Sequence, residues 1–157
     1  MKNIKVLTAC LILIGIALPL QADSSNAEGY WKTFDDKTKA LKSIVKLWED
    51  NGEMKGMIVK LFPKKGEDPD PKCDKCKGER KDKRILGMEF MWGLKKNGGK
   101  WKDGRILDPE NGKIYRSQLE VVDNGKKLEV YGYIKILFKI GRTQTWLRTD
   151  FDNSEKK

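Results

Sequence analysis

Short segments in which apolar and polar residues alternate, each bounded by turn residues, follow one another along most of this 157-residue chain. Alternation with a period of two places successive side chains on opposite faces of a β-strand. The Asn-Gly, Asp-Pro and Gly-rich stretches between the segments are typical of turns that join antiparallel strands. The pattern predicts an all-β fold, a small antiparallel up-and-down barrel of about eight or nine strands, over residues 29–149. The segments are 29–34, 41–49, 54–62, 84–94, 101–107, 114–122, 128–138 and 142–148.

The strand expected at 85–94 supplies the candidate ligand-binding residues. Strict alternation places large apolar residues on one face and two glycines and a carboxylate on the other. We take Met88, Phe90 and Trp92, with the neighbouring Glu89, as candidate wall residues of a binding site. Which face points inward depends on the strand register. Glu89 either points into the lumen with a basic partner or lies outward in water.

The first residues of the chain have the features of a cleaved export signal. A basic start is followed by an apolar run, and Ala22 provides the small residue that a signal peptidase requires. The apolar run is shorter than the roughly 20 residues that span a membrane, which disfavours an anchor. We therefore expect a signal peptide at 1–22 and a periplasmic or secreted protein; lipidation at Cys10 is the alternative. Polar segments at 23–28 and 150–157 flank the barrel domain.

The chain is strongly basic, with a formal net charge of +10 that falls to +8 if Lys2 and Lys5 are removed with the leader. Outside the cytosol the available polyanions are lipid head groups, lipopolysaccharide and acidic glycans, so we expect no nucleic-acid partner. The charge indicates either an anionic envelope component as a partner or simply a well-solvated surface.

Cys73 and Cys76 are separated by two residues within a polar loop expected at 63–84. A structural zinc site needs four ligands, and the chain has no histidine, so zinc binding within one chain is disfavoured. An even pair of cysteines in an oxidising compartment predicts a disulfide. The alternative is a thiol-disulfide redox centre, but prolines precede the pair and no helical periodicity flanks it.

The absence of histidine also excludes catalytic arrangements that depend on an imidazole base. Paired carboxylates could still support hydrolysis, yet most acidic residues occupy turns or expected solvent-facing positions. The sequence therefore favours a protein that is not an enzyme, with no cofactor and no metal.

Several motifs, in one order, resemble those of an exported bacterial family, the domain of unknown function family 2147. The resemblance covers about residues 28–149 and implies a lipocalin-like (calycin-type) barrel behind a signal peptide, with Cys-x-x-Cys in a loop. It implies no ligand and no catalytic residue. The motifs are "GYWKT" (29–33), "SIVKL" (43–47), "NGEMKGMIVKL" (51–61), "CDKCKG" (73–78), "LGMEF" (86–90), "WKDGRILDPENGKIY" (101–115), "LEVYGYI" (128–134) and "GRTQTWLR" (141–148).

The two ends of the domain are similar to the lipocalin arrangement in which an arginine on the last strand packs over a tryptophan on the first. Gly29, Trp31 and Arg148 occupy the corresponding places here. The resemblance implies that these residues close one end of the barrel, through a cation–π contact of roughly 0.5–2 kcal/mol.

Three functional hypotheses follow. The first is a small barrel that binds an apolar or amphipathic molecule, or an envelope partner, at a mouth formed by hairpin loops and the cysteine loop. The second is an interaction module with a filled barrel that contacts anionic envelope components, and the third is a redox protein that uses Cys73 and Cys76. An apolar cavity of about 300 Å³ or more would favour the first over the second.

Overall fold

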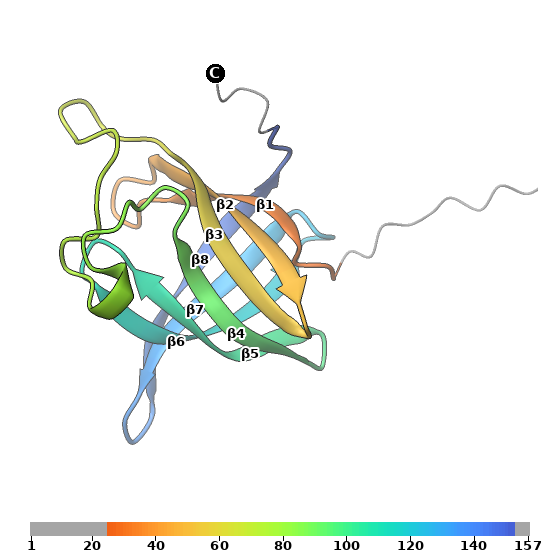
Figure 1. Ribbon diagram of the computed structural model, residues 1–157. Helices are drawn as coiled ribbons and strands as arrows, with labels where there is room; N and C mark the ends of the chain where they lie inside the picture. Colours follow the sequence, from red (N-terminus) through yellow and green to blue (C-terminus); the bar gives the residue numbers. More distant parts are fainter. Residues whose placement is uncertain (1–24, 153–157) are drawn as a thin grey trace, which may run out of the picture.

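The computed structural model describes residues 25–152 and is a closed barrel of eight antiparallel strands (Figure 1). Each strand pairs with the next in sequence, and β1 pairs with β8 to close the sheet, so the predicted up-and-down topology is confirmed. The expected signal peptide at 1–22, with Cys10, and residues 153–157 of the tail lie outside the described residues. The strands are β1 Gly29–Phe34, β2 Leu41–Asp50, β3 Glu53–Leu61, β4 Glu89–Asn97, β5 Lys100–Asp108, β6 Lys113–Val122, β7 Lys127–Lys135 and β8 Lys139–Thr149.

Within the described residues, the one helix is the short 3-10 helix η1 (Gly78–Arg80), in the loop between β3 and β4. Neither it nor any other described segment forms a helix that is long and apolar enough to cross a membrane.

The barrel has two different ends. The tight turns β2–β3, β4–β5 and β6–β7 lie at one end, together with the start of β1 and the end of β8. Large side chains fill this closed end. The longer β1–β2 and β3–β4 loops, the β5–β6 turn and the tip of the β7–β8 hairpin lie at the other, open end. The fully buried side chains at or toward the closed end are Trp31, Leu47, Met54, Met91, Leu94, Leu119 and Leu128.

The alternation expected over 85–94 is broken in the structure. β4 begins only at Glu89, and its pairing with β3 shifts on both sides of Gly56. Phe90 and Met91 are adjacent, yet both are buried. A β-bulge sets two residues against one on the partner strand and so changes which side chains point inward next to it. Trp92 therefore lies on the outer face, and Leu94, further along β4, is buried again.

The β7–β8 turn also differs from the expectation. The sequence pattern placed 128–138 in one strand and the turn after it, near Gly141. In the structure β7 ends at Lys135, the turn is Ile136–Phe138, and Gly141 pairs with Tyr133 inside the hairpin. The turn of this hairpin is therefore made of large apolar residues.

Candidate functional site

A cavity of about 740 Å³ lies at the open end of the barrel. Its deep wall is apolar, because inward-facing positions of the alternating strands carry aliphatic and aromatic side chains. Phe90 on β4 and Trp146 on β8 lie close together there, with ring centroids 6.1 Å apart. The other apolar strand residues of the wall are Phe34, Leu41, Val45, Ile58, Leu61, Ile106, Leu107, Val130, Ile134 and Ile140.

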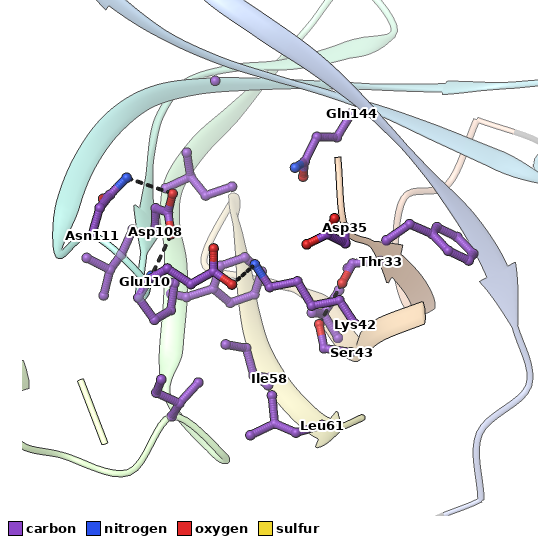
Figure 2. A pocket seen from close by; sticks show the side chains of 18 of the residues that line it. Thr33, Asp35, Lys42, Ser43, Ile58, Leu61, Asp108, Glu110, Asn111 and Gln144 are labelled. Carbon is purple, nitrogen blue, oxygen red and sulfur yellow. Dashed lines mark hydrogen bonds and ion pairs between the residues drawn. The ribbon is translucent and has the colours of Figure 1, made fainter. Parts of the chain in front are cut away.

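A few polar groups interrupt this wall. The Thr33 and Ser43 hydroxyls lie 2.6 Å apart and are buried, so they satisfy each other. The Gln144 amide donates to Asp36 (2.9 Å), and its oxygen accepts a hydrogen bond from the Trp146 indole N–H at 3.2 Å. Figure 2 shows Thr33 and Ser43 side by side, with Gln144 above them in the view, beyond Asp35. The wall thus presents amide and hydroxyl groups to an otherwise apolar space.

Charged side chains from separate strands and loops form the rim of the cavity. The Arg142 guanidinium lies 2.6 Å from an Asp36 carboxylate oxygen and 3.9 Å from one of Asp108. Lys42 and Glu110 form a second pair at 2.8 Å, seen in Figure 2. These pairs are exposed, so each contributes little to stability. Their effect is to connect β8, the β1–β2 loop, β2 and the β5–β6 turn across the mouth.

Asp35 holds the β1–β2 loop at this rim. Its carboxylate accepts hydrogen bonds from the backbone N–H and the hydroxyl of Thr38, at 2.7 and 2.9 Å, and from the Lys37 N–H at 3.1 Å. The Thr38 backbone bond is the main reason that the pKa of Asp35 lies well below its usual range, since these donors stabilise the ionised form. Asp35 is therefore a fixed anion of the loop and is unsuited to act as a general acid.

The four candidate wall residues predicted from the sequence do not all line the cavity. Phe90 lines the cavity. Met88 is buried in the core cluster but is not among the lining residues. Glu89 lies near Lys55, away from the cavity, and the Arg80 guanidinium covers the outer Trp92, with its carbon 4.3 Å from the ring centroid. A role for Phe90 in ligand contact stays a prediction. The other three do not line the cavity, and the bulge in β4 accounts for this only at Trp92, which follows it.

The polar rim and most of the wall residues were not among the residues predicted from the sequence. The sequence of β8 does indicate part of the wall and rim, because larger side chains alternate there with threonine and leucine. The larger ones are Arg142, Gln144, Trp146 and Arg148. Large side chains with a period of two on the last strand mark the inward face. The aliphatic wall residues are indistinguishable in sequence from ordinary core residues.

The closed end brings Gly29, Trp31 and Arg148 together. The Arg148 guanidinium carbon lies 4.1 Å from the Trp31 ring centroid, and the same group donates hydrogen bonds to the carbonyl oxygens of Asn26, Glu28 and Gly125. The Trp31 indole N–H donates to the Ala27 carbonyl at 2.9 Å. Partial burial lowers the pKa of Arg148 from its ordinary value. These contacts tie residues 26–28 across the base of the barrel.

The loop between β3 and β4 carries a Cys73–Cys76 disulfide. Both cysteines are buried, unlike the exposed loop that the sequence suggested. The Cys73 sulfur contacts the Pro109 carbonyl at 3.4 Å, and the Lys75 ammonium group donates to the Glu110 carbonyl at 3.0 Å. The disulfide thus fixes a loop that packs on the β5–β6 turn. Within residues 25–152, no cluster of three or more His, Cys, Asp or Glu side chains could hold a metal ion.

Replacing Cys73 and Cys76 together with alanine is expected to lower the melting temperature by about 5 °C, because a ring this short restricts the unfolded chain by only about 2 kcal/mol. Alanine is the suitable substitution, since serine would bury two hydroxyl groups. Differential scanning calorimetry measures the effect, and treating the unchanged protein with a reductant should give a similar decrease. Unfolding of the barrel under reducing conditions would contradict a local role for the disulfide.

This chain is similar to one protein family and to a solved structure. The model of the family described as "Uncharacterized protein conserved in bacteria (DUF2147)" matches residues 29–148. A solved structure, the lipocalin-family protein HP1028 of Helicobacter pylori, is similar with a TM-score of 0.68 and 22% identity, over 80% of this chain and 84% of that one. No curated protein matches significantly. The family match spans the whole barrel, so the chain belongs to the DUF2147 family, and its fold is lipocalin-like.

Proposed function

We propose that this protein binds a small apolar or amphipathic molecule inside the open half of the barrel. The observation that carries the proposal is a cavity of about 740 Å³ with an apolar wall, in a barrel whose other end is closed by packed side chains. Pockets that hold small molecules usually measure about 300–1,000 Å³ and are mainly apolar, with a few polar groups that orient the ligand.

The distribution of polarity supports an amphipathic ligand. Phe90, Trp146 and the aliphatic side chains form the deep part of the cavity, whereas ion pairs form its rim. Burial of an apolar tail would release water from the wall, at about 25 cal/mol for each Å² of apolar surface. A polar head group at the rim would stay hydrated and would contact the charged side chains there.

The two other hypotheses have less support. A filled interaction module does not need an apolar space of this size. A redox protein needs an accessible, activated thiol, whereas both cysteines here are buried in a disulfide, and the segment after them is a single 3-10 turn with no α-helical dipole to lower a thiol pKa. Export through the signal at 1–22 remains part of the proposal, and it would place the ligand in the envelope or outside the cell.

Binding of N-phenyl-1-naphthylamine, an apolar dye whose fluorescence rises in apolar sites, tests the proposal. The unchanged protein should give saturable binding. Val130→Trp, which fills the cavity from β7, should weaken binding about tenfold or more, since the added ring occupies the site. Glu129→Trp places the same ring on the outer face of the same strand and should bind the dye as the unchanged protein does.

Ile140→Trp is a second test, because Ile140 lines the cavity but is half exposed, and a larger side chain there is easier to accommodate. Thermal unfolding checks that each variant is folded. If the unchanged protein gives no saturable signal, or if both folded cavity variants bind as it does, the proposal is wrong. If the expected dye binding is observed, native mass spectrometry of protein purified from its own host should identify the natural ligand by its mass.

A further inference from the structure

The tip of the β7–β8 hairpin exposes three consecutive large apolar side chains. Ile136, Leu137 and Phe138 are 74%, 91% and 67% exposed. In Figure 1 this hairpin runs clear of the barrel as a narrow projection beyond the neighbouring strands. Hairpin turns normally carry Gly, Asn or Asp, and adjacent exposed apolar residues are unfavourable in water. The folding of the hairpin does not explain these residues at its tip.

The apolar surface of the tip continues into the cavity. Ile134 and Ile140 are paired across the hairpin immediately below the tip, and both line the cavity while remaining about half exposed. A molecule that moved along this hairpin would pass from the tip to the interior of the barrel without leaving an apolar surface.

The charges around the tip have one sign. Lys135 and Lys139 flank the three apolar residues on the two strands, and both are exposed. From Val130 to Thr149 the chain has four cationic residues and no Asp or Glu; the four are Lys135, Lys139, Arg142 and Arg148. Of these, Arg142 lies nearer the mouth and is paired with Asp36. Apolar side chains between lysines match the interface of an anionic bilayer, where acyl chains lie beneath negative head groups.

We propose that the β7–β8 tip docks this protein on an anionic lipid bilayer, with Ile136, Leu137 and Phe138 inserted among the head groups and Lys135 and Lys139 beside the lipid phosphates. The tip is a convex projection, which can enter a fluid interface without a preformed partner groove. Docking would place the mouth of the cavity toward the bilayer. The docking itself does not depend on the proposed function; only the passage of a ligand between bilayer and barrel rests on it.

Sedimentation with vesicles tests the proposal, using equal parts phosphatidylcholine and phosphatidylglycerol against phosphatidylcholine alone. The unchanged protein should bind the anionic vesicles more tightly, and salt should weaken binding. The combined variant Ile136→Ser/Leu137→Ser/Phe138→Ser should lose about tenfold or more of its affinity. Leu147→Ser is the matched control, because Leu147 is also exposed but lies near the closed end of β8, and it should bind normally.

A second pair of variants tests how much the lysine charges contribute to vesicle binding. Lys135→Gln/Lys139→Gln should weaken binding about 25-fold, since each lysine near an anionic surface contributes about a fivefold effect. The control Lys96→Gln/Lys126→Gln removes the same charge from two exposed lysines at the closed end and should have a much smaller effect.

Three results would overturn the proposal: equal binding to both kinds of vesicle, unchanged binding by the folded tip variant, or a dimer of the unchanged protein that the tip variant dissociates while neither binds vesicles. Dye binding separates docking from the proposed function. The tip variant should still bind N-phenyl-1-naphthylamine, and Val130→Trp should still bind vesicles. If the unchanged protein binds vesicles but not the dye, the proposed function is wrong and the docking proposal stands. If it binds the dye but not vesicles, the docking proposal is wrong and the proposed function stands.

Discussion

Replacing Trp31 with alanine is expected to lower the free energy of unfolding by about 3–5 kcal/mol, the usual cost of removing a large aromatic side chain from a core. Trp31 is completely buried at the closed end, where collapse of the surrounding strands is restricted by the closed sheet. The substitution also leaves the Ala27 carbonyl without its indole donor and Arg148 without the ring that it covers. Chemical denaturation, followed by circular dichroism, measures the loss.

Two further variants separate these contributions. Trp31→Phe keeps most of the buried ring but removes the hydrogen bond to Ala27, so we expect a loss of about 1–2 kcal/mol. A double-mutant cycle of Trp31→Leu with Arg148→Met, in which each substitution removes one partner of the cation–π contact, measures how strongly the ring and the guanidinium are coupled. If Trp31→Ala costs less than about 1 kcal/mol, the closed end does not depend on this residue, and another part of the core must hold the barrel shut.

The strand order could be predicted because its causes are local. Alternation fixes two faces for each segment, short turns force neighbouring segments to be antiparallel, and closure satisfies the backbone of both edge strands. The contact of Arg148 with Trp31 joins residues more than a hundred positions apart. The resemblance to lipocalins could suggest this pair, but the periodicity of the segments could not.

The candidate wall could not be predicted from the same alternation, because a single extra residue reverses it. The shifted pairing of β3 and β4 sets Phe90 and Met91 both inside and leaves Trp92 outside. Whether a strand bulges depends on how its partner twists, which is a tertiary property. An apolar residue at an inward position also gives no sign of whether it contacts a neighbour or borders an empty space.

The β7–β8 turn was missed for a different reason. The Ile136–Phe138 segment has high strand propensity and lacks the usual turn residues, so the pattern favoured a continuing strand. The position of the turn is set by the pairing of β7 with β8, which is continuous from Lys135 with Lys139 to Lys127 with Leu147. This disagreement between local preference and observed structure is the kind that a functional requirement would maintain.

Replacing Gly112 with alanine is expected to cost about 2–5 kcal/mol. Gly112 has a φ of +68°, which is unfavourable by about 1–2 kcal/mol for a residue with a Cβ. An added Cβ would also lie 1.9 Å from the Lys75 carbonyl oxygen, so the backbone of the cysteine loop would have to move away, at a cost of about 1–3 kcal/mol. The Lys75 contact with Glu110 would then be lost. Calorimetry measures the stability, and the rate of disulfide reduction reports how exposed the loop has become.

Gly78 supplies the matched control. It lies in the same cysteine loop with a φ of +59°, but an added Cβ there would meet no atom within 4 Å. Gly78→Ala should therefore cost only the backbone strain of about 1–2 kcal/mol and leave the rate of disulfide reduction unchanged. Equal effects of the two substitutions would mean that the contact between Gly112 and Lys75 does not hold the loop. A faster reduction in Gly112→Ala alone would show that the β5–β6 turn keeps the disulfide covered.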